Sequence, residues 1–482
     1  MKKHNLLKAI GILFLFYVVL TWIIPGGTFS SGTFTKGSTV PLGFGDLFLY
    51  PIATSVHQMF VLSALVVLAI GGLYGVLNKT GILASMVGGL SKKFKGKELL
   101  FIAFTTVFYA LASTGLNLSL PLFLIIPFSV AVLRTLNFSK IKTFLATFGA
   151  IIVGGMTSFV GYNMDGYDYI NYFLGVEIKS TIVYSIILFV LTLAILLVFV
   201  LIGNKKDMKI EKTKKGSKKD KEEETKEENV IPLYDKDSKV SKKPTVGVIL
   251  FVIAILITFV SMFNWSALGI DLFDTIYTKI TTVTINDFAI FQKLLGSISA
   301  FGYWGNYELI MLVVLTAITI ACVYKVSAKE AMDAFIAGAK KMLPVAIVVI
   351  FANLLLYTIN STETPFFQTI VNTLIGGASK FNYFAVAGVS AIGSIFYSSY
   401  PYLLFSVYDP ITNTMASDAN IISITIQAIY GIVSLIVPTS VMLVLGLQYL
   451  DISYKEWLKY IWKVILALLV VVTIAILIMS II

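Results

Sequence analysis

The sequence predicts an all-α integral membrane protein, and three observations support that prediction. Its 482 residues are 57% hydrophobic and only 13% charged, and the mean hydropathy is +0.89. Soluble chains are nearer half apolar and a quarter charged, so a soluble fold of this length could not bury so much apolar surface. The apolar residues also gather in runs as long as a membrane-spanning helix, and the lysines stand between these runs.

Nine apolar runs are long enough for a single span, which needs about 20 residues at a rise of about 1.5 Å each. Lys2, Lys3 and Lys8 precede the first run as they would in a signal peptide. No small-residue cleavage site follows, so we expect a retained helix. The predicted spans are residues 6–24, 59–78, 143–160, 181–203, 245–263, 307–324, 342–359, 420–446 and 461–482.

Two further apolar stretches, residues 98–136 and 383–412, are interrupted by turn-forming residues. The first contains Ala112-Ser-Thr-Gly-Leu-Asn-Leu-Ser-Leu-Pro121, and the second contains Phe396-Tyr-Ser-Ser-Tyr-Pro401. Each half is too short, or barely long enough, to cross a membrane alone. Irregular backbone at membrane depth persists only where protein or a cavity surrounds it, so we expect two re-entrant hairpins.

The distribution of lysines predicts the orientation. With a cytoplasmic N-terminus and alternating spans, the inner segments hold fifteen basic side chains besides those of the loop 204–243, whereas the outer segments hold five. Inner loops carry the excess of lysine and arginine, so the N-terminus is expected inside and the C-terminus outside a bacterial cytoplasmic membrane. The same rule accounts for the net charge of +11 without a nucleic-acid partner.

The loop 204–243 holds 14 lysines, 10 carboxylates and few apolar residues. Such a composition cannot form a core, so we expect a disordered cytoplasmic linker, with a tether to lipid or to a partner as the alternative. This linker would separate a first half, residues 1–203, from a connecting segment, residues 244–306, and a second half, residues 307–482.

The two halves share a pattern. Pro121 follows a Ser/Thr/Gly turn and Thr157-Ser158 interrupts the next apolar helix, while Pro401 and Thr439-Ser440 hold the same places 280 and 282 residues later. Because the span 245–263 lies between the halves, the second half begins on the opposite side of the membrane. The sequence therefore predicts an inverted repeat with broken helices at 143–163 and 420–446. Inverted repeats with discontinuous helices recur in secondary transporters.

The candidate substrate and ion site comprises polar positions at the two hairpin tips and the two helix interruptions. Half-helix ends offer N–H groups to anions and carbonyls to cations, and Pro438 frees a further carbonyl. Carbonyls and hydroxyls suit Na⁺, for which Thr157, Ser158, Thr439 and Ser440 are the candidates. The candidates for substrate or ion binding are Ser113, Thr114, Gly115, Asn117, Ser119, Thr157, Ser158, Asn163, Ser398, Ser399, Thr439 and Ser440.

Structural roles compete with these assignments. A serine or threonine in a membrane helix often bonds the carbonyl four residues back, and Gly154-Gly155 suits close helix packing. Tyrosines near 397–402 suit the membrane interface. A carboxylate that faces the cavity would favour a cation or a proton. The alternative is that it lies in an ordinary solvent-exposed loop. The carboxylates near predicted outer ends are Asp165, Asp168, Glu363 and Asp409.

Two capping boxes predict where helices begin at the inner surface. They are Ser327-Ala-Lys-Glu330 and Ser453-Tyr-Lys-Glu456. The first is expected to open an amphipathic helix over residues 327–341 that supports the scaffold.

Several stretches, in order along the chain, resemble one family. Leu73-Tyr-Gly-Val-Leu-Asn-Lys-Thr-Gly81, Ala334-Phe-Ile-Ala-Gly-Ala-Lys-Lys-Met-Leu343, Pro438-Thr-Ser-Val-Met-Leu-Val-Leu-Gly446 and Ile452-Ser-Tyr-Lys-Glu-Trp-Leu-Lys459 are similar to YfcC-type members of the C4-dicarboxylate anaerobic carrier family. The resemblance covers nearly the whole chain, and its last two stretches are the most specific. It implies the fold of the ion-transporter superfamily, with scaffold and transport domains, two hairpins, elevator-type movement and usually a homodimer.

The resemblance also implies dicarboxylates, basic amino acids in exchange, or related metabolites as substrates. This sequence departs from the family at both tips. The adjacent glutamates usual in the first hairpin are replaced by Ser-Thr-Gly-Leu-Asn, and the usual Ser-Gly-Ser-Gly-like turn of the second is Tyr-Ser-Ser-Tyr-Pro. Substrate identity therefore does not transfer from the family.

The expected function is secondary active transport of a small polar metabolite, coupled to Na⁺, H⁺ or exchange. The predicted cavity holds hydroxyls and amides but no lysine or arginine, which favours an amino acid, including antiport of a basic one, over a dicarboxylate. Dicarboxylate transport stays open because Na⁺ could balance the charge. The sequence contains no ATP-binding Gly-x-x-x-x-Gly-Lys-Ser/Thr motif.

Two other function classes are less well supported. A membrane enzyme would carry a motif such as His-Glu-x-x-His or Gly-x-Ser-x-Gly, or paired carboxylates within a span, and the sequence has none of these. One cysteine and two histidines are too few for a Cys/His metal site or an internal disulfide, and no cofactor is expected. A channel would not need two inverted halves.

Overall fold

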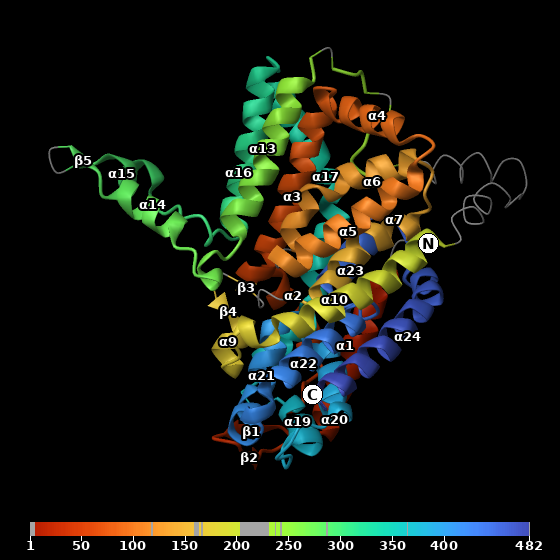
Figure 1. Cartoon of the computed structure of the whole chain (residues 1–482), viewed down its shortest axis with the longest axis vertical. Coiled ribbons are helices and arrows are strands. Elements are labelled where there is room, and N and C mark those ends of the chain that lie inside the picture. The colour runs from red at the N-terminus through yellow and green to blue at the C-terminus, as the bar shows by residue number, and fades with distance from the viewer. Residues whose placement is uncertain are drawn as a thin grey trace, which may run out of the picture.

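The structure is a computed structural model of the chain. Among the residues that it describes, nine helices are long and apolar enough to cross a membrane, and the strands form three short antiparallel hairpins. Figure 1 shows this almost wholly helical architecture, which confirms the predicted all-α membrane fold. The described residues are 5–116, 119–158, 163–164, 167–202, 231–236, 238–241, 243–285, 288–363 and 365–481.

The nine candidate spans differ from the nine predicted ones at one place. The predicted span 143–160 is not among them, because its helix stops at Gly155. In its place stands α5 (Glu98–Leu116), the first arm of the predicted hairpin 98–136, which is 19 residues long. The helix continues through Ser113 and Thr114 because both hydroxyls bond to backbone carbonyls of a neighbouring segment and do not form a turn.

The first half is built from short and long helices in alternation. We call α5, the 3₁₀ turn η1 and α6 together hairpin one, and the segment α7, η2 and α8 the first broken helix. The bounds are α1 (Asn5–Ile23), β1 (Gly27–Ser30), β2 (Thr33–Lys36), α2 (Asp46–Val56), α3 (Gln58–Lys79), α4 (Ile82–Phe94), α5, η1 (Leu120–Leu124), α6 (Ile126–Thr135), α7 (Lys140–Phe144), the π-helical η2 (Leu145–Gly149), α8 (Ala150–Gly155), β3 (Asn163–Met164), β4 (Tyr167–Asp168), α9 (Tyr169–Leu174) and α10 (Ile178–Leu201).

The second half repeats this alternation after a connecting segment whose arm, α14 to α15, projects from the body (Figure 1). We call α20 and α21 hairpin two, and α22 with α23 the second broken helix. The bounds are α13 (Thr245–Met262), η3 (Ser266–Leu268), α14 (Leu272–Thr281), β5 (Thr284–Ile285), β6 (Phe288–Ala289), α15 (Ile290–Leu295), α16 (Asn306–Val323), α17 (Ala328–Ala352), α18 (Leu354–Asn360), α19 (Phe367–Ile375), α20 (Tyr383–Phe396), α21 (Tyr400–Thr414), η4 (Ala416–Asp418), α22 (Ala419–Ser434), α23 (Val441–Tyr449) and α24 (Tyr454–Met479).

The two capping boxes mark helix starts as predicted. The Ser327 side chain accepts from the Glu330 amide, and the Ser453 side chain accepts from the Glu456 amide. The helix after Ser327 is longer than expected, because α17 runs without interruption through Pro344 to Ala352. The predicted amphipathic helix 327–341 and the start of the span 342–359 are therefore one continuous helix.

Helices α3 and α17 cross at glycines. A Cβ on Gly338 would lie 2.1 Å from the carbonyl oxygen of Gly71, and a Cβ on Gly75 would lie 2.0 Å from that of Ala334. A real Cβ cannot sit so close to backbone, so only glycine permits this contact. Close backbone approach through small residues is the usual way that membrane helices pack.

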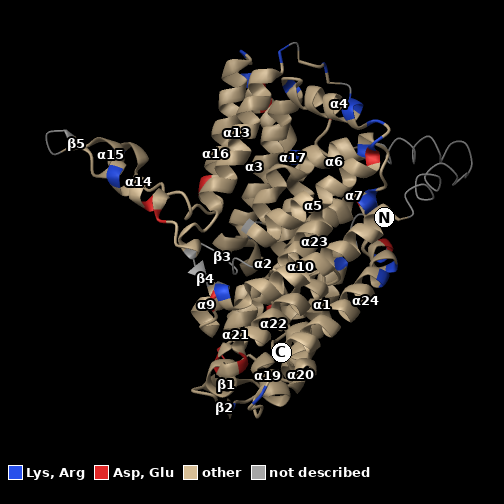
Figure 2. Cartoon of the chain, viewed as in Figure 1, with Lys and Arg blue, Asp and Glu red and all other residues tan. Residues whose placement is uncertain are grey.

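Basic residues gather toward one end of the molecule, whereas carboxylates occur at both ends (Figure 2). Figure 2 shows most of the lysines in view around α4 and α7, and carboxylates near β1 at the other end. One lysine on the α4 side is buried. Lys142 is 3% exposed, and its ammonium group donates to the carbonyls of Phe199 and, at 2.6 Å, Ile202. It caps the C-terminus of α10, where free carbonyls favour a cation.

One part of the expected linker is ordered by contacts with the body. The structure describes residues 231–236 and buries Ile231 and Leu233, which are 4% and 2% exposed. We call residues 231–236 the strap. The expectation of disorder over the whole loop 204–243 is wrong for this segment, since its two apolar side chains join the core.

Candidate functional site

The predicted polar residues of the first half meet where α8 ends, at residues 156–158, which we call the first break. Ser113 Oγ donates to the Ile151 carbonyl at 2.8 Å, and Thr114 Oγ1 donates to the Thr157 carbonyl at 2.7 Å. Ser158 Oγ donates back to the Thr114 carbonyl at 3.3 Å. All four hydroxyl residues are buried. The end of α5 is therefore fixed to the first broken helix by three hydroxyl bonds.

Close packing accompanies these bonds. A Cβ on Gly154 would lie 2.3 Å from the Ala110 carbonyl oxygen, whereas one on Gly155 would lie 3.6 Å from Ser113 Oγ. The packing role considered for Gly154-Gly155 therefore holds for Gly154, while Gly155 has room for a methyl group.

The second broken helix is interrupted at residues 435–440, which we call the second break. Thr439 Oγ1 donates to the Ile395 carbonyl at 3.1 Å, so this break too is bonded to the end of its hairpin's first arm. Ser158 and Thr114 are separated by 44 residues, as are Thr439 and Ile395. Each break is thus bonded to the end of its hairpin's first arm, although from neighbouring and not equivalent positions, since Thr439 corresponds to Thr157 at the 282-residue offset.

The carbonyls of the second break already have partners. Trp457 Nε1 donates to the Leu435 carbonyl at 2.7 Å, and the Tyr454 hydroxyl donates to the Ile436 carbonyl. The break was expected to offer carbonyls to a cation. Two of them are instead taken by aromatic side chains of α24, which reduces what remains for Na⁺.

The two broken helices touch each other. Gln427 of α22, 4% exposed, donates through Nε2 to the Gly155 carbonyl at 3.2 Å. A Cβ on Gly431, one turn further, would lie 2.2 Å from Met156 Cγ. The second broken helix therefore crosses the first at its break and satisfies a carbonyl that the end of α8 leaves free.

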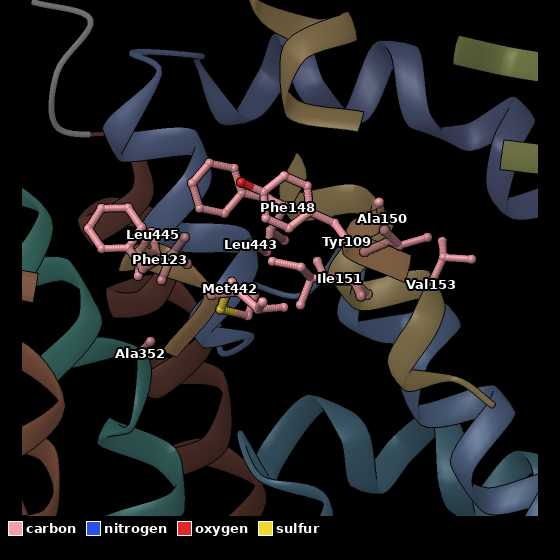
Figure 3. Close-up of a cluster of buried hydrophobic side chains, with 14 of the residues drawn as sticks. Tyr109, Phe123, Phe148, Ala150, Ile151, Val153, Ala352, Met442, Leu443 and Leu445 are labelled. Atoms are coloured by element: carbon pink, nitrogen blue, oxygen red, sulfur yellow. The ribbon is translucent and has the colours of Figure 1, made fainter. Parts of the chain in front are cut away.

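An apolar core lies beside this crossing. Figure 3 shows Met442 and Leu443 of α23 among Ile151 of α8 and Phe123 of hairpin one. A Cβ on Gly446 would lie 2.5 Å from ring atoms of Phe148. The second half of one broken helix thus packs within the other half of the protein.

The tip of hairpin two contacts a residue that the sequence did not single out. Ser398 Oγ donates to Asn353 Oδ1 at 2.6 Å, and Asn353 Nδ2 donates to the Val349 carbonyl at 3.0 Å. Asn353 is 6% exposed and stands where α17 gives way to α18. Hairpin two is therefore tied to the helix that crosses α3.

The remaining predicted residues are more scattered. Gly115 lies in the last turn of α5, Ser119 precedes η1, and Ser399 precedes α21, with both serines half-buried. Asn163 lies in β3, whose backbone pairs with β4. Asn117 and Asp165 lie outside the described residues.

A cavity of about 670 Å³ opens beside hairpin two, and we call it the hairpin cavity. It is lined by α21, the loop between α18 and α19, β1 and α9. Glu363 and Asp409, two of the predicted carboxylates, both line it, and its described lining contains no lysine, arginine or histidine. Asp409 Oδ1 accepts from the Gly32 amide at 2.8 Å. The aromatic residues of its wall are Phe29, Tyr169, Phe173, Tyr397, Tyr402, Phe405 and Tyr408.

A second cavity, of about 910 Å³, lies beside the start of α1 and the second half of α17, and we call it the strap cavity. The strap, residues 341–348 and residues 448–451 line it, with Leu7 and Lys140. The pKa of the Tyr234 phenol is raised mainly by burial and to a smaller extent by the negative charge of the Asp235 carboxylate. Along α17 and α18, the strap cavity reaches Val348 and the hairpin cavity begins at Ile359. Asn353, which accepts the hydrogen bond from Ser398, lies between the two cavities along these helices.

Sequence reasoning missed Gln427 and Asn353. Each is an amide in an apolar run, and a polar side chain within a span usually has a bonding or functional reason. That signal was available, but it names no partner. No group of three or more histidine, cysteine or acidic residues that could hold a metal occurs in the described part of the chain.

One comparison with known proteins shows the family of this chain. A family model described as C4-dicarboxylate anaerobic carrier matches residues 5–481. Among solved structures, the YdaH transporter of Alcanivorax borkumensis is similar at 12% identity over 97% of each chain, with a TM-score of 0.37, too low to support a detailed comparison. No curated protein matches significantly.

Proposed function

The chain belongs to the C4-dicarboxylate anaerobic carrier family, and from this premise we propose that it is a secondary active transporter that moves an amino acid by elevator-type alternating access. The family, and the nine apolar helices found in the described part of the chain, make it a multi-pass membrane transporter. The substrate and the mechanism are our proposals.

The hairpin cavity is the observation that favours an amino acid. Glu363 and Asp409 line it without any basic residue in the described lining. The buried Oε1 of Gln368, a further lining residue, has no hydrogen-bond partner among the described residues. Carboxylates, an unpaired acceptor and aromatic faces all attract an ammonium group, whereas a dicarboxylate would be repelled.

Uptake into proteoliposomes tests this choice. We expect saturable uptake or counterflow of one or more amino acids, weakened in Glu363→Gln and Asp409→Asn. The latter keeps an oxygen that can accept from Gly32 and so serves as a charge-only change. Uptake of succinate or malate with no response to any amino acid would overturn the assignment.

A dicarboxylate is the second candidate. The family description favours it, and so do Lys140, Lys236 and Lys341 around the strap cavity. Lys140 already pairs with Asp451 at 3.5 Å. If this candidate is correct, Glu363→Gln and Asp409→Asn should leave dicarboxylate uptake unchanged or increase it.

The proposed mechanism divides the chain into a scaffold around the α3–α17 crossing and a moving unit of both hairpins and both broken helices. The shared core of α23, α8 and hairpin one supports treating these elements as one unit. A bond from each break to the first arm of its hairpin supports the inverted repeat with halves 1–203 and 307–482. Such a unit would slide against α17 near Asn353.

Cross-linking tests this division. A Ser398→Cys/Asn353→Cys pair on a Cys322→Ala background, which removes the exposed cysteine of α16, should form a disulfide that stops transport. Reduction should restore it. Full uptake by the oxidised pair would contradict a moving hairpin two.

The proposed orientation places the strap cavity in the cytoplasm and the hairpin cavity outside, with the C-terminus outside. Val240→Cys, at a site 66% exposed, should react with an impermeant maleimide only from the inner side. We also propose a homodimer, to be tested by the mass of the purified protein in detergent.

Coupling by exchange is favoured over a dedicated Na⁺ site. The carbonyls of Gly155, Leu435 and Ile436, at or directly beside the two breaks, each accept a hydrogen bond from a protein donor and are therefore less available to Na⁺. Counterflow that persists without Na⁺ is the expected result.

A further inference from the structure

The strap lies in an unusually constrained conformation. Leu233 adopts a left-handed backbone, with φ of 56°, while its side chain is 2% exposed. A leucine rarely adopts this conformation unless the surroundings enforce it. The segment is therefore docked on the body.

The docking site is on α3 and α4. Asn78 Nδ2 donates to the Leu233 carbonyl at 2.8 Å, and Asn78 Oδ1 accepts from the Asp235 amide at 3.1 Å. A side-chain amide can donate and accept at once in this way. Further on, the Ser241 amide donates to the Gly81 carbonyl and to Ser85 Oγ, both at 3.2 Å.

Gly81 is required for this contact. Its φ is +70°, and a Cβ there would lie 2.0 Å from the Lys239 carbonyl oxygen. Asn78 and Gly81 belong to the stretch Leu73–Gly81, which the sequence marked only as a family resemblance. The structure gives these two residues a shared role in receiving the segment that follows the charged linker.

The strap also reaches α23. The Tyr449 hydroxyl donates to the Pro232 carbonyl at 3.0 Å. The Tyr449 ring is 2% exposed and packs edge-on against Phe123. The strap therefore bridges α3, in the proposed scaffold, and α23, in the proposed moving unit, along one wall of the strap cavity.

We propose that the strap is an intramolecular latch that holds α23 against α3 and limits access to the strap cavity. The proposal rests on the proposed elevator function, in which α23 moves and α3 does not. Within the described residues, four hydrogen bonds tie the segment 231–241 to α3 and α4, and one ties it to α23. The strap stays with α3 and releases Tyr449 when α23 moves.

Labelling of the purified full-length protein with a maleimide tests docking and access without requiring transport. On the Cys322→Ala background, Leu233→Cys should react at least about tenfold more slowly than the matched control Val240→Cys, because one site is 2% exposed and the other 66%. Equal rates would overturn the docking. Because Leu233→Cys could disturb the strap, Val345→Cys, 3% exposed in the strap cavity wall, serves as a second reporter.

The latch is then weakened from each side. Tyr449→Phe keeps the ring and removes one bond, and it should raise the labelling rate of Val345→Cys about three- to tenfold, with Asn78→Ala raising it further. Both variants should change the rate of counterflow, while Val240→Ala should not.

Unchanged labelling in both variants would overturn the latch, and raised labelling with unchanged counterflow would overturn its role in transport. If the parent transports no tested solute, the proposed function fails, while labelling still decides whether the strap is a latch.

Discussion

The first and second breaks are held in different ways. At the first break, Ser113, Thr114 and Ser158 join hairpin one to the broken helix through three hydroxyl bonds. At the second break, one threonine bonds hairpin two, while Trp457 and Tyr454 of α24 cap the carbonyls. Two halves with the same order of elements therefore stabilise their interruptions with different side chains.

The difference suggests a division of labour between the hairpins. Hairpin one is fixed to its broken helix by three hydroxyl bonds beside the break. Among the described residues, hairpin two is bonded at its break by Thr439 alone, with Tyr400 donating to the Ser423 carbonyl at 3.4 Å, and it contributes residues to the hairpin cavity. Its tip is tied to Asn353 in the proposed scaffold. We infer that hairpin two is the more mobile of the two and faces the solute first.

The largest expected effect tests the close packing at the first break. Gly154→Ala should destabilise the protein by about 3 kcal/mol or more, because its Cβ would lie 2.3 Å from the Ala110 carbonyl oxygen and both sides of the contact are backbone. Gly155→Ala is the matched control, since its Cβ would have an ordinary contact at 3.6 Å. Thermal unfolding in detergent measures both. Equal unfolding midpoints for Gly154→Ala and Gly155→Ala would show that the backbones of α5 and α8 are not in close contact at Gly154.

The next effect tests the aromatic caps at the second break. Trp457→Phe should destabilise the protein by about 2–3 kcal/mol, because it leaves the buried Leu435 carbonyl without its donor and removes part of a fully buried ring. Tyr454→Phe, which loses only a hydroxyl, should cost less. A Trp457→Phe protein as stable as the parent would mean that water or another group satisfies the carbonyl.

The sequence predicted the elements well because hydropathy and charge act locally. Apolar runs placed eight of the nine spans, and the capping boxes at Ser327 and Ser453 marked helix starts correctly. The predicted interruption near Ser113 and Thr114 was wrong because apolar length cannot show whether a hydroxyl turns the chain or bonds a neighbouring helix. Thr114 does the latter, so α5 is long.

The candidate site could be predicted only in part for the same reason. The hydroxyls at both breaks were expected to bind substrate or ion, which stays a prediction. The structure buries them and gives Thr114 and Thr439 carbonyl partners far along the chain. Asn353, Gln427 and the strap depend on contacts across more than 40 residues, which no local pattern encodes.

A smaller effect compares equivalent hydroxyls in the two halves. Thr114→Val should cost about 1–2 kcal/mol, since it leaves the buried Thr157 carbonyl without its donor at 2.7 Å. Thr439→Val should cost less, because its single bond is 3.1 Å long. Both should reduce uptake while the protein stays in the membrane, as should Thr157→Val and Ser158→Ala. A larger loss of stability from Thr439→Val would reverse the ranking of the two breaks.

The smallest effect on stability, and the most direct test of a mobile hairpin two, is at its tip. Ser398→Ala should change the unfolding free energy by less than about 1 kcal/mol, because the serine is only half-buried and water can replace its bond. The maximal uptake rate should change nonetheless, since the bond to Asn353 joins the two proposed units.

Asn353→Ala should act through the same bond, so the double variant should behave like either single one, whereas independent sites would give additive effects. Ser399→Ala, at the neighbouring half-buried serine, is the control. Additive losses of rate in the Ser398 and Asn353 pair would show that this contact does not control the movement.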